Sequence, residues 1–232
     1  MKVTMHKINC FIGVALLLFA LSARGQQNYG LRFNSFNVPQ ENRTSLVIGN
    51  KEPLCFDKEE RVALSFDLFL EPNQQTYFGY VLRIVNNSGQ RINLLYDQGH
   101  KIFRLTANGS YTGINFSIAD ADLFRRWTNI MLVLEDGQLS LFVNQKYFSK
   151  VTISLSDLCL RLTYGGGNDG NFSTTDVPPM VLRNVRIMVG GKETYYWPLR
   201  FSDSSGVVYD SISHRAAAAV NPVWVSGLHS RW

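Results

Sequence analysis

Apolar and polar residues alternate in short runs along most of the chain from Leu46 to Leu199, and this two-residue period predicts β-strands. In the clearest run, the apolar side chains on one face are Val62, Leu64, Phe66, Leu68 and Leu70. We expect further strands near residues 78–84, 92–96, 103–105, 114–118, 130–134, 139–143, 158–164, 181–189 and 195–199. Asp136-Gly137 supplies the positive φ angles of a tight hairpin turn, whereas residues 117–126 predict one short helical turn. The pattern predicts an antiparallel, all-β sandwich or barrel.

The first residues have a different character. An apolar run at residues 11–20, too short to span a bilayer, follows two lysines and precedes Ala23-Arg24-Gly25. We expect a cleaved signal peptide at residues 1–25 and a secreted or periplasmic mature chain. Cys10 lies before the apolar run, so the lipobox of a lipoprotein is not expected. No later run approaches the length of a membrane helix, so the mature chain is expected to have no integral membrane segment.

The length of the chain suits one domain. Residues 26–200 are enough for a sandwich with a sizeable core. The tail at residues 201–232 has a less regular pattern, because Ala216 to Ala219 interrupts the alternation. We expect an extension that packs back on the sandwich through Trp197, Trp224 and Trp232, or that links it to another domain.

Charge and cysteine content narrow the function classes. The formal net charge is +5, but three of the 23 basic residues lie in the expected signal, which leaves 20 against 18 acidic residues. The sequence has no basic stripe, so nucleic acid is not an expected partner. Cys55 and Cys159 either form a disulfide in an oxidising compartment or remain two buried thiols. Their surroundings do not match a zinc or nucleophile motif.

Two sets of motifs resemble a known family. Arg126-Trp127-Thr128-Asn129-Ile130, the Asp136-Gly137 turn and Leu141-Phe142-Val143-Asn144 resemble the paired strands of laminin-G and concanavalin A-like jelly rolls. A second set is similar to laminin-G-like domains at the N-terminus of secreted kelch or galactose-oxidase-like proteins of glycan-foraging bacteria. It comprises Thr174-Thr175-Asp176-Val177-Pro178-Pro179-Met180, Leu182-Arg183-Asn184-Val185-Arg186-Ile187, Tyr196-Trp197-Pro198-Leu199, Asn221-Pro222-x-Trp224 and His229-x-x-Trp232. The resemblance implies a two-sheet jelly roll beside a β-propeller. The sequence has no propeller repeat, so no oxidase residue is transferred to it.

Catalysis is not expected. A glycosidase on this fold needs two carboxylates that face each other. Glu59 and Glu60 are adjacent and would point to opposite faces of a strand, and Glu135-Asp136 lies at a turn. No cofactor is expected, with calcium as one open alternative. Asn168, Asp169 and Asp176 offer hard oxygen ligands, although such residues are also ordinary turn material.

A candidate binding patch follows from the outward positions of four expected strands. If the apolar residues face the core, then Asp67, Arg83, Asn93 and Arg104 face outward. On neighbouring strands these side chains would form a patch able to bind sugar hydroxyls; the alternative is an ordinary solvated sheet face. The sequence thus predicts a non-catalytic, carbohydrate-associated binding or accessory module. The alternative is a structural or interaction domain that docks a propeller or a partner protein, and a glycosidase comes third.

Overall fold

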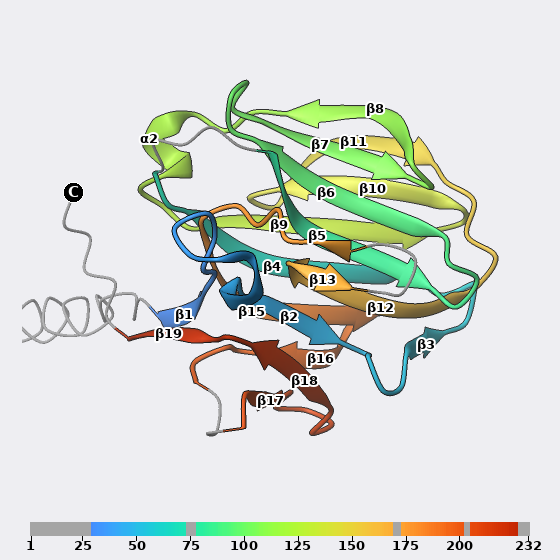
Figure 1. Cartoon of the computed structure of the whole chain (residues 1–232). Helices are drawn as coiled ribbons and strands as arrows, with labels where there is room; N and C mark the ends of the chain where they lie inside the picture. The colour runs from blue at the N-terminus through green and yellow to red at the C-terminus, as the bar shows by residue number, and fades with distance from the viewer. Residues whose placement is uncertain (1–28, 73–77, 169–172, 202–204, 227–232) are drawn as a thin grey trace, which may run out of the picture.

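The chain forms two antiparallel β-sheets that stack on each other, as Figure 1 shows for a computed structural model. The structure describes residues 29–72, 78–168, 173–201 and 205–226. The predicted all-β sandwich is confirmed. The expected signal peptide at residues 1–25 lies outside the described residues. None of the helices in the described chain is long and apolar enough to cross a membrane.

One sheet has eight strands. Their order is β11 (Lys146–Thr152), β10 (Gln138–Val143), β9 (Thr128–Glu135), β4 (Val62–Leu70), β15 (Met180–Val189), β1 (Tyr29–Arg32) and β19 (Val223–Ser226), with β16 (Lys192–Trp197) paired to β15. The predicted hairpin between β9 and β10 is confirmed, because Asp136 and Gly137 have φ angles of 50° and 68°. These are the angles that match the right-handed twist of the flanking strands.

The other sheet has nine strands. Their order is β17 (Val207–Tyr209), β18 (Ala216–Val220), β2 (Ser45–Ile48), β12 (Leu158–Gly165), β5 (Phe78–Asn86), β6 (Arg91–Asp97), β7 (Ile102–Ala107) and β8 (Ser110–Phe116), with β3 (Leu54–Phe56) paired to β12. A small ribbon is formed by β13 (Gly167–Asn168) and β14 (Ser173–Thr174). The short helices are η1 (Gln40–Asn42) and α2 (Asp120–Leu123), and α2 is the helical turn that the sequence predicts.

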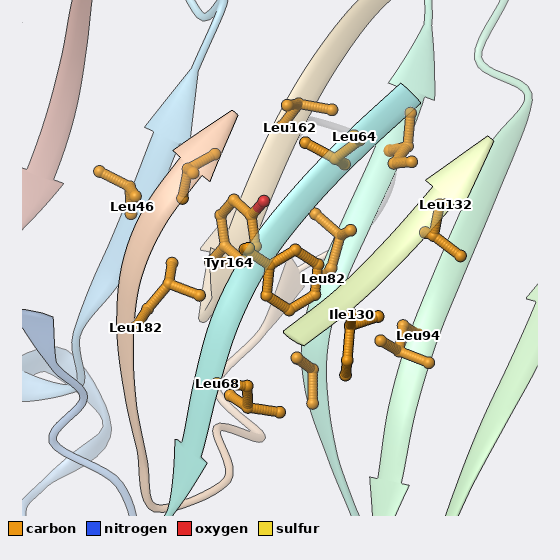
Figure 2. Packing of buried hydrophobic residues seen from close by; sticks show 14 of the residues in the cluster. Leu46, Leu64, Leu68, Leu82, Leu94, Ile130, Leu132, Leu162, Tyr164 and Leu182 are labelled. Carbon is orange, nitrogen blue, oxygen red and sulfur yellow. The ribbon is translucent and has the colours of Figure 1, made fainter. Parts of the chain in front are cut away.

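The core lies between the sheets and consists of the side chains at the alternate apolar positions. Figure 2 shows leucines and isoleucines from both layers around Tyr164, whose ring meets that of Phe66 edge-on at 5.3 Å. Trp197 is fully buried, and its Nε1 donates a hydrogen bond to the backbone oxygen of Arg215. Cys55 and Cys159 lie directly opposite each other on β3 and β12 and form a disulfide. The sequence left open whether these cysteines form a disulfide or remain two buried thiols, and in the structure they form the disulfide.

The tail contributes strands to both sheets. β17 and β18 extend the nine-stranded sheet beside β2, and β19 extends the eight-stranded sheet beside β1. The expected break at Ala216 to Ala219 is wrong, because these residues belong to β18 and alternate between exposed and buried positions. Four alanines have equal hydropathy, so their sequence hides this alternation. Trp224 packs against the core from β19, whereas Trp232 lies outside the described residues.

Candidate functional site

The structure brings three of the four predicted patch residues together. Arg83, Asn93 and Arg104 lie on the adjacent strands β5, β6 and β7. Their side chains share the outer face of the nine-stranded sheet, since the flanking residues of each strand belong to the core. Asp67 lies on β4 in the other sheet, so a patch common to all four residues is wrong. Alternation distinguishes core from solvent, but it does not show to which sheet a strand belongs.

A row of polar side chains crosses four strands of this face. Arg83 pairs with Asn93, Asn93 with Thr106, and Thr106 with Tyr111 in the strand register. The Arg83 Nε donates to the Asn93 Oδ1 at 2.8 Å, and the Asn93 Nδ2 donates to the Thr106 Oγ1 at 3.0 Å. Arg83, Asn93 and Thr106 therefore form a hydrogen-bonded chain that fixes the orientation of the Asn93 side chain, and Tyr111 continues the row in the strand register.

A second row runs beside it and includes Arg104. The register places Leu95 opposite Arg104, and Arg104 opposite Asn115. The Arg104 Nη2 donates to the Asp97 Oδ2 at 3.2 Å, and the His100 Nδ1 lies 2.8 Å from the same oxygen. Burial alone would raise the pKa of Asp97, but the hydrogen bonds and charge of His100 and the hydrogen bond from Arg104 outweigh it and lower this pKa. Asp97 is thus held as a carboxylate that orients Arg104.

Burial separates the predicted residues into two groups. Arg83 and Asn93 are only 5% and 6% exposed. The Arg83 guanidinium lies 4.8 Å from the centre of the Tyr80 ring, and the β13–β14 ribbon packs close to the same face at Thr163. Arg104 is half-buried and remains accessible. Arg83 and Asn93 therefore support the face, whereas Arg104 is the accessible residue of the three.

Two aromatic rings lie exposed at the margins of the same face. Tyr111 on β8 is 51% exposed and Phe78 at the start of β5 is 42% exposed. The Asn115 Nδ2 donates a hydrogen bond to the Tyr111 hydroxyl, and the Phe78 ring meets the Tyr80 ring edge-on. Flat aromatic surfaces therefore flank the polar rows.

Two further arginines on this face were missed by sequence reasoning. Arg161 on β12 pairs with Val85 on β5, and Val85 pairs with Arg91 on β6. The three side chains therefore form a third row on the outer face. The Arg161 Nε is buried and has no hydrogen-bond acceptor among the described residues. Alternation indicates that Arg91 and Arg161 point outward, but the adjacency of β12 and β5 cannot be seen in the sequence.

Asp67 belongs to a separate network on the outer face of the eight-stranded sheet. Its carboxylate accepts hydrogen bonds from the Asn129 Nδ2 at 3.0 Å and the Asn184 Nδ2 at 2.8 Å, and it pairs with Arg183 at 3.4 Å. The Asn184 Oδ1 accepts from the hydroxyl of Tyr29 at 2.8 Å. Another hydroxyl, that of Tyr196, donates to the same oxygen at 2.7 Å.

This network ties strands together. Asn184 has a φ of 52° at an irregularity of β15, and its side chain connects β4, β1 and β16. The Arg183 guanidinium, which is almost fully buried, stacks on the Trp127 ring at 3.9 Å. Asn tolerates the left-handed conformation because its short side chain forms local hydrogen bonds. The arrangement explains Asp67 as a structural residue.

A groove of about 260 Å³ lies at one end of the sandwich, between the β9–β10 turn and residues 153–158. Its rim carries Glu60 and Glu135, but the Glu60 carboxylate accepts from the Asp57 backbone and Glu135 pairs with Arg61 at 3.6 Å. These two glutamates are thus engaged by the protein itself.

The open alternative of a calcium site is not tested by the structure. Asp169 lies outside the described residues, and Asp176 is exposed while its backbone oxygen accepts from the Tyr80 amide at 2.8 Å. Within the described ranges, no group of three His, Cys, Asp or Glu side chains gathers in a way that would hold a metal ion. Calcium binding by Asn168 and its neighbours stays a prediction.

Comparison with solved structures identifies similar folds. A protein from Bacteroides ovatus, described as a candidate carbohydrate-binding protein, aligns with a TM-score of 0.56 and 9% identity over 88% of this chain and 61% of that chain. Domains LG4-5 of the mouse laminin α1 chain align with a TM-score of 0.49 and 14% identity over 80% of this chain and 47% of that one. Sheep galectin-11 aligns with a TM-score of 0.40 and 13% identity over 59% and 95% of the two chains.

These likenesses concern the fold alone. The predicted jelly roll of the concanavalin A and laminin-G type is confirmed, whereas a position beside a kelch propeller, which the resemblance implies, stays an expectation. The chain spans about three fifths of the length of the Bacteroides ovatus protein. No family model and no curated protein matches the sequence.

Proposed function

We propose that this chain is a non-catalytic glycan-binding module and that the glycan lies on the outer face of the nine-stranded sheet, across β5 to β8. The observation that carries the proposal is the placement of Arg104 and Asn115 beside the exposed ring of Tyr111. Amide and guanidinium groups are suitable partners for sugar hydroxyls, and an aromatic ring offers a flat apolar surface to a pyranose. The fold shared with the Bacteroides ovatus protein adds support by analogy.

Each residue of the face has a distinct role in this proposal. Tyr111 stacks on a sugar ring, and Arg104 donates to hydroxyl or acidic oxygens while Asp97 holds its guanidinium in place. Asn93 and Arg83 are positioning residues, because they are buried and hydrogen-bonded to each other. A face whose side chains are already oriented loses little conformational entropy when a ligand binds.

The carboxylate content of the face supports a binding role rather than hydrolysis. Among the outward positions of β12 and β5 to β8, Asp97 is the acidic residue, and it is engaged by His100 and Arg104. Hydrolysis of a glycosidic bond usually needs two carboxylic groups, one on each side of the bond. Asp97 without a second carboxylate would bind and orient, but it would not cleave.

A second candidate function is docking of a neighbouring protein domain. The outward side chains of β17 and β18 are all apolar, and they are Val207, Tyr209, Ala216, Ala218 and Val220. Tyr209 and Val220 are 55% and 49% exposed. A strand that is apolar on both faces is typical of strands covered on both sides. A propeller or another partner that covers this face is the alternative to a glycan.

We also propose that the mature chain is secreted or periplasmic. The disulfide between Cys55 and Cys159 supports this location, because such bonds persist in oxidising compartments. Together with the expected signal at residues 1–25, it supports a site of action outside the cytoplasm.

A glycan array and affinity electrophoresis of the mature chain test the proposed function. Tyr111→Ala and Arg104→Ala should each weaken retention by about tenfold, which corresponds to ~1.4 kcal/mol. Tyr147→Ala is the matched control, because Tyr147 is similarly exposed on β11 of the other sheet. Lack of retention on every polysaccharide, with tight binding of a partner protein, would replace the glycan by the docking function.

A further inference from the structure

The outer face of the nine-stranded sheet gathers arginines that are far apart in the sequence. Arg161, Arg83, Arg91 and Arg104 come from β12, β5, β6 and β7, which lie side by side in Figure 1. The register places all four side chains on the same face, because Val85 pairs with both Arg161 and Arg91. The linear sequence contains no basic stripe, yet the folded sheet forms one.

Basic residues outnumber acidic ones at the outward strand positions of this face. Asp97 is the acidic residue at the outward strand positions of β12 and β5 to β8, so the strands present a formal charge of +3. A patch of one sign attracts ligands of the opposite sign and raises their local concentration. Planar guanidinium groups also match the geometry of carboxylate and sulfate oxygens.

We infer that the glycan bound here is anionic and carries carboxylate or sulfate groups along its chain. This inference rests on the proposed function. Arg161 and Arg91 lie on either side of Val85 and two strands apart, which corresponds to about 10 Å. Val85 itself is only 8% exposed, so the acidic substituents of a glycan that lies across this row meet the two guanidinium groups that flank it.

The unpartnered nitrogen of Arg161 supports this assignment independently. Its Nε is buried without a hydrogen-bond acceptor in the described part of the chain. A buried donor that lacks an acceptor is costly, and more so when the group is charged. An oxyanion that binds beside Val85, with a small rotation of the Arg161 side chain, supplies the missing acceptor.

The spacing of the charges favours an acidic polysaccharide over a nucleic acid. Each strand of a nucleic acid carries one charge per ~3.4 Å. Here one arginine per β-strand is interleaved with neutral hydrogen-bonding groups such as Asn93 and Thr106. Sparse charges among amide and hydroxyl groups match a chain with separated acidic groups and many free hydroxyls.

Affinity electrophoresis and calorimetry of the mature chain test the inference with paired polymers. Polygalacturonate is compared with its methyl ester, and dextran sulfate with dextran, so that each pair shares a sugar backbone and differs in its charged groups. We expect at least one anionic polymer to bind about tenfold tighter than its neutral partner, with an affinity that falls as salt rises. The pair that shows the difference identifies carboxylate or sulfate as the recognised group.

Two substitutions locate the effect on the sheet. Arg161→Gln and Arg91→Gln should each reduce anionic binding about five- to tenfold and leave binding of a neutral glycan nearly unchanged. Arg125→Gln is the matched control, because Arg125 is exposed beside α2 and away from these strands. If Arg161→Gln lowers the melting temperature, Arg91→Gln and the salt dependence of the unaltered chain still test whether the bound glycan is anionic.

The outcomes separate the inference from the proposed function. Equal binding of the charged and neutral polymers overturns the anionic ligand but leaves glycan binding intact. Lack of binding to all four polymers, together with an empty glycan array, removes both. Binding of single-stranded DNA as tight as that of the anionic polysaccharide shows general polyanion attraction and also overturns the inference.

Discussion

Arg83 and Asn93 are joined by a 2.8 Å hydrogen bond across β5 and β6, and both side chains are almost completely buried. Their burial changes the role that the sequence alone suggests for them. Sequence reasoning expects both to be outward-facing side chains that contact sugars. The structure makes Arg83 a support for the face, and it leaves Arg104 as the accessible one of these two arginines.

Replacement of these two arginines should therefore have different consequences. Arg83→Ala leaves the Asn93 Oδ1 without its donor, and we expect unfolding in urea to show a loss of about 1–3 kcal/mol. Arg104→Ala should change stability by less than about 0.5 kcal/mol, because its ion pair with Asp97 is partly solvated. Equal losses of unfolding free energy for the two variants would contradict the different roles of Arg83 and Arg104.

Asn184 should be important for stability and not for glycan binding. Asn184→Ala removes hydrogen bonds to Asp67, Tyr29 and Tyr196 and places alanine at a φ of 52°, so we expect a loss of about 3 kcal/mol. Asn184→Gly is the control, because glycine also lacks the side-chain hydrogen bonds but adopts a positive φ without strain. It should be about 1 kcal/mol more stable than Asn184→Ala. Urea unfolding measures both. A loss of glycan affinity in folded Asn184→Ala would move the site to the eight-stranded sheet.

The buried hydroxyl of Tyr164 should be dispensable. Its oxygen has no hydrogen-bond partner among the described residues, and burial raises the pKa of this phenol well above its usual value. Tyr164→Phe should therefore stabilise the protein by about 1 kcal/mol and raise the melting temperature by about 2–4 °C. Tyr196→Phe is the contrasting variant, because it loses a hydrogen bond to Asn184 and should melt lower. A lower melting temperature for Tyr164→Phe would indicate an acceptor near that hydroxyl.

The β17–β18 hairpin should lose stability in acid. Burial alone would raise the pKa of Asp210, but hydrogen bonds from Ser213, Ile212 and Arg215 outweigh it and lower this pKa. Because the folded-state pKa lies below the unfolded value of about 3.9, this stabilisation is complete at higher pH and is lost as pH falls through the folded-state pKa.

The matched variant for this test is Asp210→Asn. Its deficit in unfolding free energy against the unaltered chain should be present at pH 6 and shrink toward pH 2, as urea titrations at each pH will measure. Other acidic groups are common to both proteins and cancel in the difference. A deficit that stays constant over this range would show that the charge of Asp210 is not what stabilises the turn.

The strands were predictable where hydropathy contrast is high. The runs that became β4, β5, β9 and β10 have large apolar residues on one face and a mixture that includes Asp67, Arg83 and Asn129 on the other, and the Asp136-Gly137 turn has a specific backbone requirement. β18 could not be recognised in this way, since alanine at every position gives no contrast. Local pattern therefore predicts an element only when its two faces differ in chemistry.

The composition of the binding face was predictable only in part. Strand order depends on contacts between distant residues, so alternation could not place Asp67 on the sheet opposite Arg83. For the same reason Arg161, more than seventy positions from Arg83, was not recognised as a neighbour of β5. Sequence reasoning identified outward residues correctly and lacked the information to group them.

The pairing of Tyr29 with Ser226 brings the two ends of the described chain to one place, at the edge where β1 and β19 meet. A short linker is therefore enough to join them, and a circularly permuted version with new ends at an exposed loop should keep the same sheets. A fusion partner attached at either end of the described chain would be joined to the eight-stranded sheet, which is the layer opposite the arginine-bearing strands. The module can thus be tethered to a solid support by its termini while that face remains open to long polymers.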